Sequence, residues 1–246
     1  MLCFFRHPAR SAGGMTRTMT RDEPDLNLPA LPPHVRKRWP VAVERAARKT
    51  QAAVPNPAVG PLVKAAQKGS TAAQRMVWLQ RAASAWAQPL QGVAACRRGC
   101  AHCCHIPVTI SSVEAALIGR HIGQAPAQPG ESVRLDTFTD LTDAVTALQA
   151  LSTAVAPSPC PFLREDACSI YEVRPIACRL LLNLDDDDLL CRRVPGQDIP
   201  VPYADSSQLK ALFLMAQPAA PLADIRSFFV QQAPLSEVSA GTKKGS

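Results

Sequence analysis

The chain has 246 residues, of which 47% are hydrophobic and only 5% aromatic, with a formal net charge of +7. Such a chain can bury a substantial core, so it is not a very small secreted scaffold that depends on disulfides. No stretch approaches the roughly 18–20 consecutive apolar residues of a membrane span, and no membrane partner is expected. Few aromatics and abundant Ala and Leu favour helices over a β-sandwich.

The N-terminal segment, residues 1–33, is rich in Pro, Arg, Thr and Asp and lacks apolar periodicity. We predict that it is disordered. Its apolar start, Met1–Phe5, is too short for the hydrophobic region of a signal peptide. The expected location is therefore the reducing cytoplasm, where clustered cysteines are more often metal-binding or catalytic than disulfide-bonded.

Residues 34–91 are predicted to form a basic helical region, because their apolar residues recur every three to four positions. We expect a first helix from Pro33, which Pro40 bends or breaks. A short second helix is predicted over Pro61–Gln67, and a longer third one over Thr71–Gln88 with Ser70 or Thr71 as its N-cap.

The charge is unevenly distributed along the chain. Residues 1–100 contain 16 Lys and Arg against 4 Asp and Glu, whereas residues 101–246 contain 11 against 16. A basic half of this kind is compatible with nucleic-acid binding. However, no recognised nucleic-acid-binding motif accompanies the charge, and a solvated helix face is the simpler interpretation.

Residues 92–232 are predicted to be one cysteine-rich domain, followed by a flexible tail over 233–246. Ser111 and Glu114 have the spacing of a capping box at a helix start. The predicted helices of this domain are Val113–Ile122, Glu131–Ala154, Ser206–Ala216 and Pro221–Gln232. The predicted fold class is mainly α, with helices packed around an irregular cysteine-rich metal-binding core.

The cysteines are the most informative feature of the sequence. Eight of the nine lie between positions 96 and 191, and Cys3 stands apart. Four of the eight form a compact motif, C-x3-C-x2-C-C. Thiolates are soft ligands that favour zinc, Cu(I) and iron–sulfur clusters. The candidate metal ligands are Cys96, Cys100, Cys103, Cys104, Cys160, Cys168, Cys178 and Cys191.

Two conformations of the segment 96–104 would bring its thiols together. As a helix, it would place all four cysteines on one face about 100° wide. As a loop, it would wrap a metal through the flexibility of Gly99. Eight cysteines suffice for two four-cysteine sites, or for one site with spare thiols, and the spacing leaves both arrangements open.

The second half of the cysteine region contains Cys160-Pro-Phe-Leu163, followed by Cys168-x-Ile-Tyr-x-x-Arg-Pro-x-x-Cys178-Arg. Together with the opening motif, these elements resemble the YkgJ-type cysteine-cluster family of zinc- or iron-chelating domains. The resemblance covers about residues 96–192 and implies seven of the eight candidates as ligands. Cys191 is added because it lies near them in the sequence.

Several other polar residues near the cysteines have both a functional and a structural interpretation. His102 and His105 are possible zinc ligands, although surface histidines are the simpler interpretation. Arg174 and Arg179 are able to offset thiolate charge or to bond backbone carbonyls. Tyr171 is expected to serve packing.

The acidic run Asp185–Asp188 has oxygen ligands suited to hard cations such as Mg²⁺. A solvated acidic turn that opens a short helix over Leu189–Arg192 explains the run more simply, because carboxylates favour a helix N-terminus.

The sequence is compatible with three functions. The first is a cytosolic protein that holds zinc or iron, including a 4Fe-4S cluster, through its cysteines. The second is an iron–sulfur-dependent enzyme resembling the flagellin lysine N-methylases, which carry a similar cluster. The third is a zinc-stabilised nucleic-acid-binding module. No glycine-rich site for S-adenosylmethionine is found, so no catalytic residue is assigned.

Overall fold

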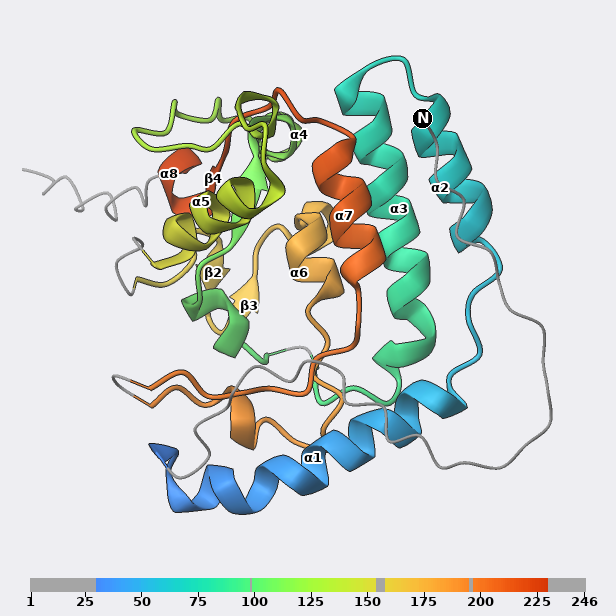
Figure 1. The fold of residues 1–246 in the computed structure, drawn as a ribbon, viewed down its shortest axis with the longest axis vertical. Helices are drawn as coiled ribbons and strands as arrows, with labels where there is room; N and C mark the ends of the chain where they lie inside the picture. Colours follow the sequence, from blue (N-terminus) through green and yellow to red (C-terminus); the bar gives the residue numbers. More distant parts are fainter. Residues whose placement is uncertain (1–29, 98, 154–157, 195–196, 230–246) are drawn as a thin grey trace, which may run out of the picture.

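The structure is a computed structural model that describes residues 30–97, 99–153, 158–194 and 197–229 (Figure 1). Most of the predicted disordered segment, the tail over 233–246, and Cys3 lie outside the described residues. Within these ranges the fold is mainly α, as predicted, with only two short two-stranded sheets. No helix in the described part of the chain combines the length and apolar character needed to cross a membrane.

The α-helices are α1 (Pro33–Ala52), α2 (Val59–Lys68), α3 (Ala72–Gln91), α4 (Ser112–Ile122), α5 (Leu141–Thr153), α6 (Ile176–Leu180), α7 (Ser207–Met215) and α8 (Ile225–Phe228). Short 3-10 turns are η2 (His102–His105), η3 (Leu135–Thr137), η4 (Tyr171–Val173) and η5 (Leu189–Cys191). Strands β1 (Thr109–Ser111) and β4 (Leu222–Asp224) pair antiparallel, as do β2 (Leu163–Arg164) and β3 (Ala167–Cys168).

Helices α2, α3, α6 and α7 pack together on one side of the molecule (Figure 1). Their shared core includes Met76, Leu79 and Phe213, all buried. The N-cap predicted at the start of α3 is present, because Thr71 Oγ1 accepts a hydrogen bond of 3.1 Å from Gln74 N. This capping fixes the first turn of the long helix against which α6, the carrier of Cys178, packs.

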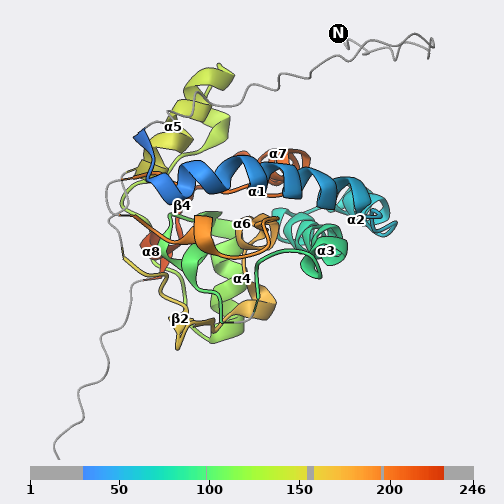
Figure 2. The same cartoon turned by 90° about the horizontal axis from the view of Figure 1, so that it is seen from below.

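Helix α1 lies across the end of the molecule below α3, α6 and α7 (Figure 1), and the view from below shows it beside the segment that contains η5 (Figure 2). The helix continues through Pro40 and does not break there. Val35, Ala42 and the partly buried Trp39 pack against Leu190 of η5. This apolar contact keeps α1 helical despite the backbone hydrogen bond that Pro40 cannot donate.

Two predicted helices differ from those observed. The helix predicted over Glu131–Ala154 begins only at Leu141, because Val133 pairs with Leu222 in an isolated bridge and Asp140 Oδ1 accepts from Thr142 N at 2.7 Å. Ala154 itself lies outside the described residues. The helix predicted over Pro221–Gln232 is instead β4 followed by α8, and residues 230–232 lie outside the described ranges. In both cases strand pairing through Leu222 takes precedence over helical periodicity.

Helix α4 begins as its capping box predicts. Ser111 Oγ accepts from Glu114 N at 3.1 Å, and Gly123 ends the helix in the left-handed conformation, with φ of 70°. The carboxylate of Glu114 is fully buried and reaches across to α6, where its Oε1 accepts from Ile176 N at 2.8 Å. Glu114 thereby holds the N-terminus of the short helix that carries Cys178.

Candidate metal centre

Three separate segments bring the eight candidate cysteines into one region. The first segment, residues 96–104, is a loop and not a continuous helix. Cys100 N closes a turn onto Arg97 O at 3.0 Å, and η2 follows. Gly99 has φ of 83°, a left-handed conformation that favours glycine. Of the two conformations considered for this segment, the loop is therefore the one observed.

Four cysteines pack against one hydrophobic cluster, and we call them the core group: Cys104, Cys160, Cys168 and Cys178. Cys160 N donates to Cys104 O at 2.7 Å, which joins the first segment to the second. The hairpin β2–β3 turns at Glu165 and Asp166, both with positive φ, and places Cys168 opposite Leu163.

Two other cysteines share one asparagine. Asn183 N donates to Cys96 Sγ at 3.4 Å, and Asn183 Nδ2 donates to Cys191 Sγ at 3.3 Å. Cys96 packs with Leu182 and Leu184 in a hydrophobic cluster different from that of the core group. No sequence pattern identifies Asn183, because its two partners lie 87 and 8 residues away in the chain.

Cys103 lies between these two sets. A hydrogen bond with the Cys104 thiol lowers the pKa of Cys103 to about 7, and the same hydrogen bond, with burial, raises the pKa of Cys104 well above its usual range. Among the thiols with a shifted pKa, Cys103 is the one whose pKa is lowered, and a thiolate is the form that binds metal. After burial, its negative charge is among the causes that raise the pKa of Cys178 and Cys191.

Burial is the main cause that raises the pKa of the other perturbed thiols, Cys96, Cys160, Cys168, Cys178 and Cys191, the last to about 12. The charges of neighbouring thiolates raise these values further. Arg174 acts in the opposite direction, because its cation lowers the pKa of three thiols from both sets, Cys96, Cys103 and Cys168. A bound cation would relieve the same accumulation of negative charge.

The thiols do not form a ready-made coordination sphere. All eight are free of disulfides. Among the described residues, no three His, Cys, Asp or Glu side chains form a group that could hold a metal ion as they lie. The donor chemistry fits zinc or an iron–sulfur cluster, since the site is rich in thiols, partly buried and accompanied by a cation. Coordination would require the thiol side chains to converge.

The run Asp185–Asp188 is a turn that opens η5, as the simpler interpretation predicted, but the prediction that the turn is solvated is wrong, because basic residues of α1 pair with its carboxylates. Asp185 is completely buried and accepts from Arg38 Nε at 2.7 Å and from Arg45 Nη1 at 3.2 Å. Lys49 Nζ pairs with Asp186 at 2.9 Å. These contacts use basic residues of α1 inside the protein, so the carboxylates are already occupied by cations.

The last aspartate of the run, Asp188, joins the turn to the loop that contains the first four cysteines. Asp188 Oδ2 lies 2.8 Å from His102 Nε2 and its Oδ1 lies 3.1 Å from Arg192 Nη2. His102 thus has a structural partner. Arg179 likewise bonds the backbone, donating to Arg174 O at 2.8 Å and to Glu172 O.

The guanidinium of Arg174 has a different environment. It lies over the ring of Tyr171, 4.0 Å from the centroid, and its buried Nε has no hydrogen-bond partner. Tyr171 itself is half exposed. The stacking leaves the positive charge of Arg174 available to the thiols that it stabilises.

Arg226, on α8, stabilises the core group, although it lies after the cysteine region in the sequence. It pairs with the buried Asp224 and donates to the backbone carbonyls of Ser158, Cys104 and Ile106 at 2.9, 3.3 and 3.2 Å. These bonds tie the two segments that carry Cys104 and Cys160 to the C-terminal part of the fold.

Replacing Arg226 with glutamine should lower the free energy of unfolding by about 2–3 kcal/mol, because Asp224 loses a buried cation and three carbonyls lose their donor. Thermal unfolding followed by circular dichroism would measure the change. Arg134→Gln is the matched control, because its pair with Asp136 is exposed to solvent and should contribute little to stability. If both substitutions lower the free energy of unfolding equally, Arg226 does not stabilise the segments that carry Cys104 and Cys160 more than a surface ion pair would.

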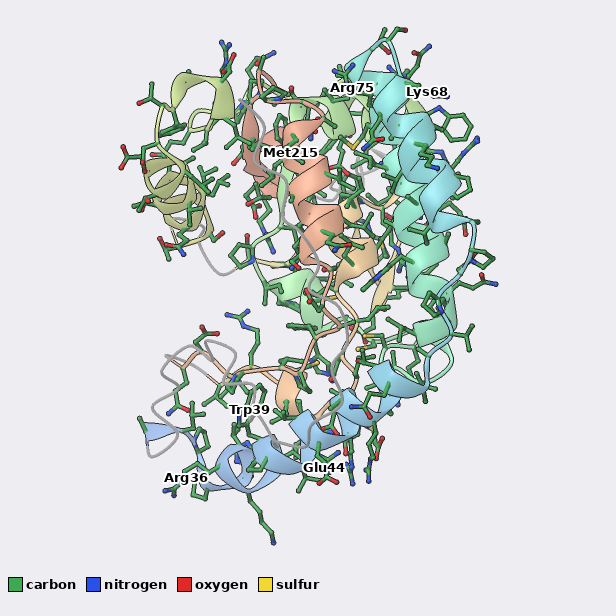
Figure 3. The ribbon with its side chains drawn as sticks, turned by 45° about the vertical axis from the view of Figure 1, so that its right-hand side comes forward. Arg36, Trp39, Glu44, Lys68, Arg75 and Met215 are labelled. Carbon is green, nitrogen blue, oxygen red and sulfur yellow. The ribbon has the colours of Figure 1, made fainter. Side chains whose placement is uncertain are left out.

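A cavity of about 310 Å³ lies between α2, α3 and α7, with Arg75 and Met215 among its lining residues. Figure 3 shows these two residues near one end of the molecule, whereas Arg36 and Trp39 belong to α1 at the other end. No cysteine lines this cavity. The cavity therefore does not form part of the thiol site.

Comparison with known proteins agrees with the motifs. Residues 95–193, less than half of the chain, match a family model described as "CxxCxxCC: Putative zinc- or iron-chelating domain". The matched residues coincide with the part of the chain, about residues 96–192, that resembles the cysteine-cluster family in sequence. The first interval holds three residues here, Arg97 to Gly99, where the printed motif has two. No curated protein and no solved structure matches the chain.

Proposed function

We propose that this protein holds zinc or iron through clustered cysteine thiolates, in a reducing compartment such as the cytoplasm. The observation that carries the proposal is that three chain segments, residues 96–104, 160–178 and 191, bring eight thiols into one region without disulfides among them. Packing does not require such a concentration of thiols, and free thiolates are stable only where disulfides are kept reduced.

The electrostatics of the region support a cationic ligand. Several partly buried thiols accumulate near one another, and burial together with mutual repulsion opposes their ionisation. Arg174 is the cation that acts on three of them. Arg226 lowers the pKa of one more, Cys160. These two guanidiniums do not balance four or more thiolates, so a metal ion or cluster would supply the missing positive charge.

The test is to purify the full chain anaerobically without a metal-affinity tag and to measure zinc, iron, inorganic sulfide and the visible spectrum on one sample. Iron with sulfide and a broad band near ~400 nm would identify an iron–sulfur cluster. A colourless protein with one or two equivalents of zinc would identify a zinc protein. A folded chain that binds neither metal after reconstitution would refute the proposal.

A further inference from the structure

The cavity between α2, α3 and α7 lies outside the thiol site, and all of its lining residues lie outside the part of the chain that matches the family model. Its volume of about 310 Å³ is at the lower end of the range found for small-molecule sites. Its walls are mostly apolar and include Val63 of α2, Leu79 of α3 and Leu212 of α7. Met215 also lines the cavity and is 67% exposed, so the cavity reaches the solvent there.

Arg75 is the cationic residue in the wall of this cavity. Its Nε donates to Ala216 O at 2.7 Å, and its Nη1 donates to Gly69 O at 3.0 Å. These bonds fix the guanidinium between the C-terminal ends of α7 and α2, but they use only two of its five N–H groups. Among the described residues, Nη2 has no hydrogen-bond acceptor. The group is therefore held in place with donors to spare.

Gly69 makes room for this arrangement. A Cβ at residue 69 would lie 2.8 Å from Arg75 Cγ and 3.0 Å from Arg75 N. A side chain at residue 69 would thus displace the arginine from the turn between α2 and α3. The position of the cation is set by the backbone of this turn and of Ala216, and no acidic partner is needed to hold it.

The positive charge at this end of the molecule is not balanced. No acidic side chain lines the cavity, and within the part of the chain that the structure describes none pairs with Arg75 or with the exposed Lys68 of α2. Lys68, Arg75 and Met215 lie near the same end of the molecule (Figure 3). An apolar cavity with an uncompensated guanidinium in its wall is complementary to a molecule that combines an alkyl chain with one anionic group.

We propose that this cavity binds a short alkyl carboxylate, with the chain against Val63, Leu79 and Leu212 and the carboxylate at Arg75. A planar carboxylate accepts well from the N–H groups of a guanidinium. The cavity has room for about ten non-hydrogen atoms, because a water molecule occupies about 30 Å³ of the liquid. Octanoate has this size and is the probe. The site is independent of the proposed metal function, because no cysteine lines it.

The test is a titration of the full chain, labelled with ¹³C at its methionine methyl groups, with octanoate. The NMR signal of Met215 should shift with a Kd of about 1 mM or lower. The signal of Met76, which is buried and does not line the cavity, should move less. 1-Octanol, which has the same chain but no charge, should bind at least about tenfold more weakly.

Three substitutions locate the site. Arg75→Gln should weaken octanoate binding at least about tenfold and leave the binding of octanol unchanged. Leu212→Trp should abolish the binding of both molecules, because the larger side chain fills the cavity. Arg81→Gln is the matched control, because Arg81 is on the same helix, lies over the ring of Trp78 and does not line the cavity. This variant should bind octanoate as the wild type does.

The proposal is overturned if millimolar octanoate leaves the Met215 signal unchanged, or if octanoate and octanol bind with equal affinity. A folded Arg75→Gln variant that binds octanoate as tightly as the wild type would overturn it as well. If that variant does not fold, the comparison of octanoate with octanol on the wild type decides the question. Zinc and iron contents are measured separately, so failure here leaves the metal proposal standing.

Discussion

Replacing Asp185 with alanine should lower the free energy of unfolding by about 2–4 kcal/mol, which corresponds to a fall in Tm of about 5–12 °C for a chain of this size. The carboxylate is completely buried and is shared by Arg38 and Arg45 of α1. Its removal leaves these two partly buried cations with only the more exposed Asp186 and Asp187. Differential scanning calorimetry would measure the effect.

Asp186→Ala is the control for this prediction. Asp186 pairs with Arg45 and Lys49, but its side chain is 51% exposed, so its loss should cost less than about 1 kcal/mol. The prediction is wrong if the two alanine variants unfold at the same temperature. In that case burial of Asp185 would not distinguish it from an ordinary surface ion pair.

The second large effect is a pH dependence that originates at Glu114. Burial raises the pKa of its carboxyl to about 7, although hydrogen bonds from the backbone of Ile176 and Ser111 act in the opposite direction. In the unfolded chain the group ionises at its ordinary pKa, near 4.3. Between about pH 4.5 and 7 the unfolded state loses its proton while the folded state retains it, so the folded state loses stability as the pH rises.

The size of this loss is on the order of 3 kcal/mol by pH 8, because each unit of pKa difference corresponds to about 1.4 kcal/mol. Glu114→Gln removes the titration but keeps an oxygen for Ile176 N. The variant should therefore be more stable than the wild type at pH 8, and the advantage should shrink toward pH 5. Urea denaturation at four pH values would measure it.

Exposed Glu131 offers the comparison, because Glu131→Gln should shift stability little at any of these pH values. The charge of Glu114 also contributes to the raised pKa of the Cys178 thiol, but that pKa lies well above its ordinary value, so this thiol stays protonated over the pH range used and the difference between the proteins isolates the carboxyl. Parallel stability curves for the wild type and Glu114→Gln would show that Glu114 is already ionised in the folded state.

The sequence predicted well what depends on local chemistry. Thr71 and Ser111 cap the helices that they were expected to cap, and Gly123 ends α4. The mainly α class is confirmed, and so is the resemblance to the cysteine-cluster family over about residues 96–192. Local capping rules succeed because the donor and the acceptor lie within a few residues of each other.

What the sequence did not predict depends on partners distant in the chain. Val133 pairs with Leu222 and so keeps the segment before Leu141 out of the helix. Asn183 reaches Cys96 only because the chain folds back over 87 residues. The opposite charges of α1 and of Asp185–Asp188 were visible separately, but about 140 residues separate Arg45 from Asp185. Periodicity and composition carry no information about such pairing.

The ion pairs between α1 and the acidic turn determine how much of the chain must accompany the part that matches the family model. The family match begins at residue 95, whereas Arg38, Arg45 and Lys49 lie well before it. A fragment cut at the borders of the match would carry Asp185, Asp186 and Asp187 without these cations. Sequence similarity therefore marks the cysteine-bearing part of this protein, but a unit that folds by itself would have to extend to α1 on one side and to α8, which carries Arg226, on the other.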